Sequence, residues 1–116
     1  ARDIQQDLKS KGLPWEKAKG FDGAAPLGTF FPKSAFGDPG KLDFHLLVNG
    51  ELKQKGNTAD MIFNFDQIIA YVTQFITLKK GDLIFTGTPA GVGPVKIGDR
   101  LQGFIDNYPA FDFLVK

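Results

Sequence analysis

The chain has 116 residues, with 14 Lys and Arg against 13 Asp and Glu, a formal charge of +1 and no cysteine. This length suits one small domain with a core, and the balanced charge provides no basic field for nucleic acid or a membrane surface. The absence of cysteine excludes disulfides and thiolate metal ligands, and no apolar run approaches the roughly 20 residues of a membrane span. We therefore expect a soluble, cytoplasmic protein that binds neither nucleic acid nor membranes.

The first residues predict a short helix, because Ile4 and Leu8 lie four apart on one face and Gly12 stands where such a helix would end. The next stretch, residues 13–40, is dense in Gly and Pro and predicts irregular chain with short extended pieces. Long connections of this kind are often functional. Because the chain starts at Ala1 within a predicted element, we expect it to be part of a longer polypeptide.

The clearest local signal is a hairpin that begins at Leu42. Apolar and polar residues alternate up to Val48, and Asn49-Gly50 supplies the positive-φ turn before a second short strand. Two more strands are predicted at the C-terminal end, separated near Asn107-Tyr108-Pro109. The run Leu83–Phe85 also reads as a buried strand.

Between these strands, apolar residues from Phe65 to Ile76 recur at helical spacing, with Asn64 or Asp66 as the N-cap and Gly81 near the end. This pattern predicts a helix of three turns packed on the sheet. Strands and hairpins with few helices indicate an α+β fold, mostly β, and not alternating β-α-β units.

The stretch "GDLIFTGTPAGVGPVKIGDR" raises the question of function. Its glycines let main-chain N–H groups approach a ligand closely, and the hydroxyl of Thr88 can bind an anion or a polarised oxygen. A plain turn between strands explains the same composition. The loop by itself does not decide between these interpretations.

Three other residues are candidates for binding an anionic substrate. Lys19 lies among glycines and aromatic residues, where its ammonium could act as a fixed positive charge. Arg2 and Gln5 are three apart and can present a guanidinium and an amide to a carboxylate. Exposed side chains with no function are the alternative for all three, and the single histidine, His45, is expected to be a surface residue.

Four segments cover nearly the whole chain: "ARDIQ" at 1–5, "GLPWEKAKGFDGAAPLG" at 12–28, "LVNGELKQKGNTADMIF" at 47–63 and "GDLIFTGTPAGVGPV" at 81–95. In this order they resemble the fumarylacetoacetate hydrolase family, and most closely its small acylpyruvate hydrolase and oxaloacetate decarboxylase branch. Four motifs in the same order are far more specific than any one of them.

The resemblance implies a mixed β-sheet roll like the family's C-terminal domain, with a few short helices, in a protein that is usually a homodimer. It also implies one Mg²⁺ or Mn²⁺ ion held by a Glu-x-Glu pair and an Asp, and a His-Glu pair on a lid. In the family pattern all of these residues precede Ala1. We therefore expect residues 1–116 to be the C-terminal portion of a single catalytic domain, without metal ligands and inactive alone.

The resemblance also assigns roles to the candidates. Arg2, Gln5, Lys19 and Thr88 match substrate-binding residues, and Lys19 and Gln5 match catalytic ones. The implied reaction is metal-dependent hydrolysis of the C–C bond of a 3-acylpyruvate, or decarboxylation of an oxo acid such as oxaloacetate. Both pass through a metal-stabilised pyruvate enolate, whose developing charge a lysine ammonium can stabilise.

Other functions remain open at this point. One is an isomerase or decarboxylase of homoprotocatechuate-type aromatic catabolism, and another is a catalytically incomplete subunit for binding or oligomerisation. A plain structural β-domain would leave the four candidate residues unexplained. The residues before Ala1 would discriminate between an enzyme and a binding subunit, because an intact Glu-x-Glu and Asp there would favour the enzyme.

Overall fold

The computed structural model describes all of residues 1–116. Its helices are α1 (Arg2–Ser10), α2 (Glu16–Lys19) and α3 (Phe65–Val72), and its strands are β1 (Asp43–Val48), β2 (Glu51–Asn57), β3 (Arg100–Ile105) and β4 (Tyr108–Leu114). Three short 3₁₀ turns complete the regular structure. None of the helices has the length and apolar character needed to cross a bilayer.

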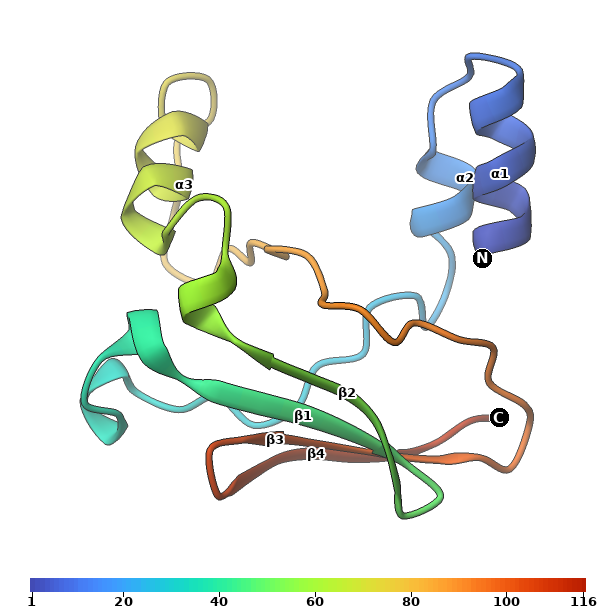
Figure 1. Cartoon of the computed structure of the whole chain (residues 1–116). Coiled ribbons are helices and arrows are strands. Elements are labelled where there is room, and N and C mark those ends of the chain that lie inside the picture. The colour runs from blue at the N-terminus through green and yellow to red at the C-terminus, as the bar shows by residue number, and fades with distance from the viewer.

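The four strands form one antiparallel sheet in the order β2-β1-β3-β4 (Figure 1). Asn49 and Gly50 join β1 to β2 at φ angles of 53° and 81°, so the predicted two-residue turn is confirmed. Asp106, at φ 49°, begins the two-residue turn between β3 and β4, whose second residue, Asn107, does not have a positive φ. The α+β class, mostly β, is confirmed, and every strand pair within these residues is antiparallel.

Apolar and polar side chains largely occupy different faces of the sheet, since successive residues of a strand point to opposite faces. The register places the following residues on one, largely apolar face: Phe44, Leu46, Val48, Leu101, Gly103, Ile105, Phe111 and Phe113. Pro89 and the ring of Phe44 both lie over Gly56, so the chain that follows α3 runs along this face. Residues 83–95 of that chain are called the threonine loop below.

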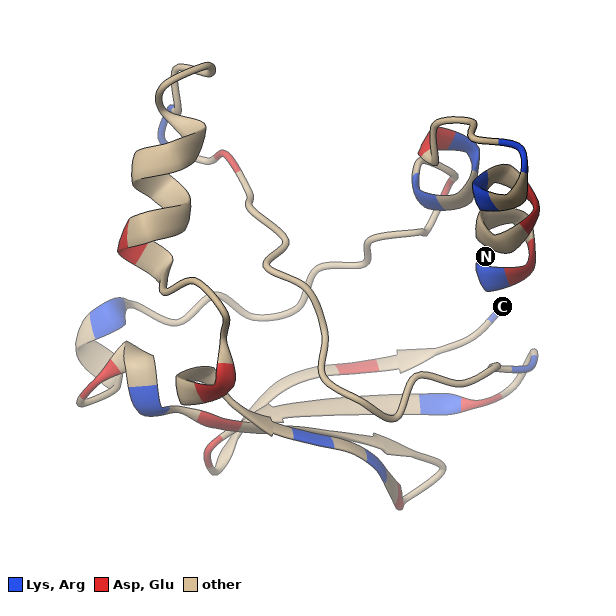
Figure 2. Cartoon of the chain, turned by 45° about the horizontal axis from the view of Figure 1, so that its top comes forward, with Lys and Arg blue, Asp and Glu red and all other residues tan.

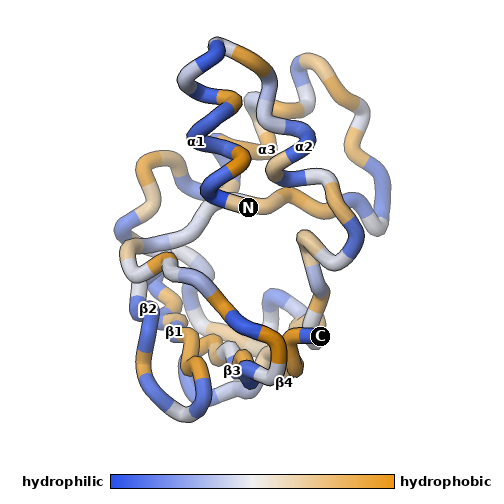
Figure 3. Tube along the Cα trace, turned by 90° about the vertical axis from the view of Figure 1, so that its right-hand side faces the viewer, coloured by the Kyte–Doolittle hydropathy of each residue, from blue (hydrophilic) through white to orange (hydrophobic).

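All three helices stand on the same side of the sheet (Figures 1 and 3). Only four residues are buried, namely Leu8, Ala18, Gly103 and Ala110. Leu8 and Ala18 lie in the helix pair α1 and α2, whereas Gly103 and Ala110 lie in the sheet. The molecule therefore has two small packed regions, with irregular chain between them.

The helix predicted after Asn64 forms, but its length and its packing differ from the prediction. Asn64 accepts a hydrogen bond from the Gln67 N–H and its own N–H donates to the Gln67 side chain, each at 2.9 Å, which confirms this residue as the N-cap. The helix ends at Val72 after about two turns, where the Thr73 hydroxyl donates back to the Ile69 carbonyl. It stands clear of the sheet (Figure 1), with Tyr71 65% exposed.

One further prediction was wrong, and two others were right only in part. Leu83–Phe85 do not form a buried strand: these side chains are 38–68% exposed and their backbone has no hydrogen-bonded neighbour, which a strand requires. Residues 13–40 are mostly irregular, as predicted, but they also form α2 and parts of two short 3₁₀ turns. The two C-terminal strands are confirmed, but the turn between them ends before Tyr108, and Pro109 belongs to β4, because an edge strand tolerates proline.

Candidate functional site

Arg2, Gln5 and Lys19 lie on two helices that pack against each other. Leu8 of α1 and Ala18 of α2 provide the buried contacts, at 8% and 1% exposure. Such burial of apolar side chains is what holds two short helices together, since neither is long enough to be stable alone. The packing therefore gathers three of the four candidate residues into one structural unit.

Gln5 has the most unusual environment of the three. Its side chain is half-buried, and its Oε1 atom is buried without a hydrogen-bond donor. Buried polar atoms nearly always have a partner, because leaving one unpaired costs about 1–3 kcal/mol. Within residues 1–116, no donor pairs with the Gln5 amide oxygen.

The charged candidates on the same helix pair are exposed. Within residues 1–116, neither Arg2 nor Lys19 takes part in an ion pair or a side-chain hydrogen bond. The helix pair is rich in charged residues, whereas α3 contains only Asp66 (Figure 2). A guanidinium and an ammonium without protein partners remain available for an anion.

Thr88 lies on a different element, the threonine loop, where its side chain is exposed. Its Oγ1 accepts a hydrogen bond of 3.0 Å from Nε2 of Gln54 in β2. The same Nε2 also donates to the main-chain oxygens of Pro89 and Ala90, at 3.1 and 3.3 Å. These hydrogen bonds place Thr88 beside β2, and the loop runs between the sheet and the helices (Figures 1 and 3).

The single histidine lies away from these candidates. His45 is on the opposite, more polar face of the sheet from Leu46, and its ring stacks on Phe104 with the centroids 4.7 Å apart. It was predicted to be a surface residue, and on this polar face it is half-buried. Ring stacking in the sheet accounts for its position without a catalytic role.

Among residues 1–116, no three His, Asp or Glu side chains come together as a metal site. Hard divalent ions require several oxygen ligands held in one place. The residues of this chain therefore do not fit the ion that the family resemblance implies, and we derive no chemical step through it.

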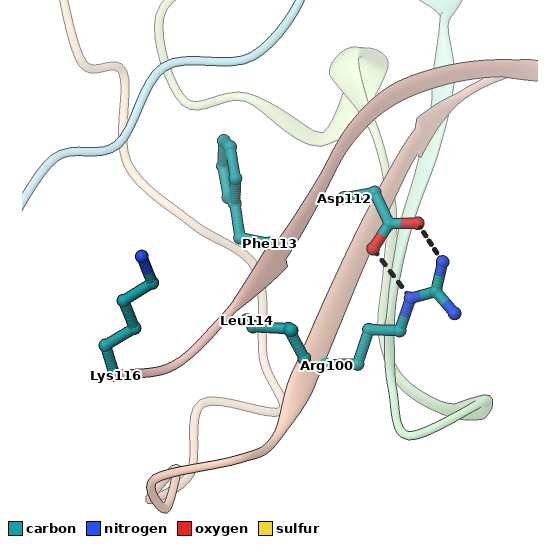
Figure 4. Close-up of a pocket in the computed structure, with 5 residues that line it drawn as sticks. All are labelled: Arg100, Asp112, Phe113, Leu114 and Lys116. Atoms are coloured by element: carbon teal, nitrogen blue, oxygen red, sulfur yellow. Dashed lines mark hydrogen bonds and ion pairs between the residues drawn. The ribbon is translucent and has the colours of Figure 1, made fainter.

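A second charged site lies on the polar face of the sheet, in a shallow hollow near the C-terminus (Figure 4). Nε and Nη2 of Arg100 donate to the two carboxylate oxygens of Asp112, at 2.8 and 2.6 Å. These hydrogen bonds lower the pKa of Asp112 and raise the pKa of Arg100. Because each charge is already paired with the other, this hollow is a structural feature and not a candidate for catalysis.

The sequence analysis missed Gln54. It lies in a short strand of mostly polar residues, "ELKQKGN", where one more glutamine attracts no notice. Alternation gave no signal, because a regular strand starting at Glu51 would place Gln54 opposite His45 on the polar face; only the shifted register, in which Gln54 faces Leu46, places it on the largely apolar face. A polar residue on such a face usually has a specific partner.

Comparison with known proteins identifies the family. Residues 1–111 match the model of the fumarylacetoacetate (FAA) hydrolase C-terminal domain, so the chain belongs to this family. It is 50% identical over all 116 residues to "Oxaloacetate tautomerase FAHD1, mitochondrial" from Mus musculus, covering 52% of that protein. It is also 50% identical over 108 residues to "Oxaloacetate tautomerase YcgM" from Escherichia coli (strain K12), which is 92% of this chain and 49% of that one.

A solved relative is fumarylpyruvate hydrolase from Pseudomonas aeruginosa, crystallised in complex with Mn²⁺ and pyruvate. Its TM-score is 0.90 at 38% identity, and the match covers 98% of this chain and 49% of that chain. The chain thus spans about half the length of the relatives it matches.

Proposed function

We propose that the full-length protein is an enzyme that converts a small 2-oxo acid through its enol or enolate, with oxaloacetate as the first substrate to test and 3-acylpyruvates as the second. The observation that carries this proposal is the packing of α1 on α2, which gathers Arg2, Gln5 and Lys19. The names of the relatives, oxaloacetate tautomerase and fumarylpyruvate hydrolase, support the same substrate class.

Each candidate has a role that its chemistry suits. Arg2 binds a substrate carboxylate through two parallel N–H donors, and the Thr88 hydroxyl donates to a carboxylate or oxo oxygen. The Gln5 Oε1 atom, buried without a donor, accepts from a substrate hydroxyl or from the water that reacts. Lys19 places its ammonium where negative charge develops on the 2-oxo oxygen.

One type of intermediate, an enolate with its negative oxygen on C2, explains why several reactions fit these residues. In tautomerisation, a proton leaves C3 of oxaloacetate and another adds to the C2 oxygen. In decarboxylation, the C3–C4 bond breaks and CO₂ departs. The electron pair of the broken bond stays on the remaining part and forms the pyruvate enolate, which is then protonated at C3. In acylpyruvate hydrolysis, water adds to the distal carbonyl and the same enolate leaves. Lys19 would stabilise the negative oxygen in each case.

Lys19→Met in the full-length protein tests the proposal. We expect kcat on oxaloacetate to fall about 10²–10³-fold with a smaller change in KM, because a charge used mainly on the developing enolate acts in the transition state. Lys17→Met is the matched control, since Lys17 is an exposed lysine of the same short helix. Both the keto–enol interconversion and the release of pyruvate should be followed. Equal rates for parent and Lys19→Met on oxaloacetate and on an acylpyruvate would overturn the assignment.

Several features of the full-length protein belong to the same proposal. Residues 1–116 would form the C-terminal portion of one catalytic domain, in a homodimer that uses Mg²⁺ or Mn²⁺ bound by residues outside this chain. The Mn²⁺ complex of the Pseudomonas aeruginosa relative supports a divalent ion. Cytoplasmic location stays a prediction, and the mouse relative is named as mitochondrial.

A further inference from the structure

One side chain supplies every hydrogen bond of the threonine loop. No backbone–backbone hydrogen bond involves residues 83–95, and no other side-chain hydrogen bond reaches them. The three that exist all come from Nε2 of Gln54, which donates to Thr88 Oγ1 and to the oxygens of Pro89 and Ala90 at 3.0–3.3 Å. The position of Thr88 therefore depends on this glutamine.

A β-bulge in β2 directs Gln54 toward the loop. Leu52 pairs with Leu47 and Gln54 pairs with Leu46, so Lys53 is an extra residue between two successive partners. In a regular strand, Leu52 and Gln54 are two residues apart and would point to the same face of the sheet. The bulge separates them and places Gln54 on the loop side, which is a known use of bulges beside binding sites.

At Gly91, the backbone of the threonine loop lies so close to the bulge of β2 that no side chain fits between them. A Cβ atom at Gly91 would overlap the main-chain oxygen of Lys53, and Gly91 has a φ of +95°, a conformation that other residues rarely adopt. Gly93 of the same loop has open space around its Cβ position. The contact between loop and strand is thus specific to Gly91 and the bulge.

The direction of these hydrogen bonds determines what Thr88 can bind. Main-chain oxygens only accept, so the two that face Gln54 fix its NH₂ group toward the loop. Thr88 Oγ1 must then accept from the same group, and its hydroxyl hydrogen points elsewhere. A threonine that already accepts from a glutamine is left as a donor, which suits a carboxylate or a carbonyl oxygen.

We propose that Gln54 is the positioning residue of the site: it holds the threonine loop on the bulge of β2 and sets Thr88 to donate its hydroxyl to the carboxylate or oxo group of the substrate. Gln54 acts through Thr88 and does not touch the substrate itself. The identity of the substrate in this inference rests on the proposed function. The attachment of the loop by Gln54 does not depend on it.

The test uses the full-length protein and Gln54→Met, which keeps the length of the side chain and removes the donor. We expect KM for oxaloacetate to rise about tenfold while kcat stays within about twofold, as for the loss of one hydrogen bond to a charged group. Thr88→Val should raise KM about ten- to a hundredfold. The double variant should resemble Thr88→Val alone, because both changes remove the same interaction.

Gln102→Met is the matched control. Gln102 is a glutamine of the same sheet whose Nε2 donates to Asp112 at 3.1 Å on the opposite face, so KM should not change. A KM of Gln54→Met equal to that of the parent would overturn the proposal, and so would fully additive effects of Gln54→Met and Thr88→Val.

A measurement without substrate separates this proposal from the proposed function. In NMR spectra, Gln54→Met should shift and broaden the amide signals of Thr88, Ala90 and Gly91, and Gln102→Met should leave them in place. Unchanged loop signals in Gln54→Met would overturn the positioning role. If the parent converts no oxo acid, the proposed function fails, and these signals still decide whether Gln54 holds the loop.

Discussion

The sheet and the threonine loop lie side by side and are held in opposite ways. The four strands are joined by continuous ladders of backbone hydrogen bonds, whereas the thirteen residues of the loop depend on one glutamine side chain. Elements with few buried contacts and few hydrogen bonds open locally at low cost. The comparison indicates a well-bonded sheet beside a loop that opens more easily, which suits the binding role proposed for Thr88.

The helices also differ in how much side chain they bury. α1 and α2 bury Leu8 and Ala18 against each other and carry three candidate residues, while α3 buries none of its side chains in this chain. Ile69 and Tyr71 of α3 are 45% and 65% exposed. Local capping, more than packing, therefore defines α3.

The largest effect should follow from filling the space at Gly103, the buried glycine of β3. A Cβ atom there would overlap the ring of Phe111, which stacks on Phe113 with centroids 5.1 Å apart. We expect Gly103→Val to lower the free energy of unfolding of the full-length protein by about 2 kcal/mol, the usual cost of overpacking. Thermal unfolding measures this loss.

Gly93→Ala provides the contrast, because Gly93 lies in the threonine loop with nothing within 4 Å of its Cβ position. Its effect should stay within about 0.5 kcal/mol, as for most exposed substitutions. Equal losses in the free energy of unfolding for Gly103→Val and Gly93→Ala would show that the loop is as tightly packed as the sheet, which would contradict the contrast between the two.

A smaller and local effect should follow from Asn64→Ala at the start of α3. This change removes the side-chain acceptor of the reciprocal cap with Gln67. We expect a cost of about 1 kcal/mol, the typical value for an N-cap. Because α3 stands clear of the sheet, amide hydrogen exchange should speed up in α3 and stay unchanged in β1 and β3. Faster exchange in the strands as well would mean that helix and sheet unfold together.

Local signals in the sequence predicted the local structure well. Alternation together with Asn49-Gly50 predicted the first hairpin, and Asn64 was correctly proposed as a cap. Packing was predicted less well, since an apolar stripe shows that a helix has a face to bury but not what covers it. This is why α3 was wrongly placed on the sheet and Leu83–Phe85 were wrongly predicted as a buried strand.

The candidate site shows the same limit. Arg2, Gln5, Lys19 and Thr88 were nominated from motifs, and their roles stay predictions. The unpaired Oε1 of Gln5 and the three hydrogen bonds of Gln54 depend on contacts between distant parts of the chain. A one-residue bulge decides which face Gln54 occupies, and the pattern "ELKQKGN" does not reveal that bulge.

The smallest effect concerns the ion pair between Arg100 and Asp112 on the polar face (Figure 4). The Arg100 hydrogen bonds lower the folded-state pKa of Asp112 below its ordinary value near 3.8. A carboxyl with a lowered pKa stabilises the fold above its unfolded-state pKa, and this contribution is lost as the pH falls through the folded-state pKa. The side chains are 57% and 44% exposed, so solvent and salt screen the pair and the contribution is slight.

Asp112→Asn should therefore lower the Tm of the full-length protein slightly at about pH 6. The difference from the parent should shrink below about pH 4, because the Asp112 carboxyl is protonated there in the unfolded state and, at lower pH, in the folded state as well. High salt should shrink it in the same way. Asp22→Asn is a matched control, because Asp22 is an exposed carboxylate without an ion pair or a side-chain hydrogen bond. A Tm difference for Asp112→Asn that persists unchanged from about pH 6 to about pH 3 would show that the charge of Asp112 is not the cause. The stability of the polar face would then come from the backbone ladder of β3 and β4 alone, and the contrast between sheet and loop would be one of backbone hydrogen bonds only.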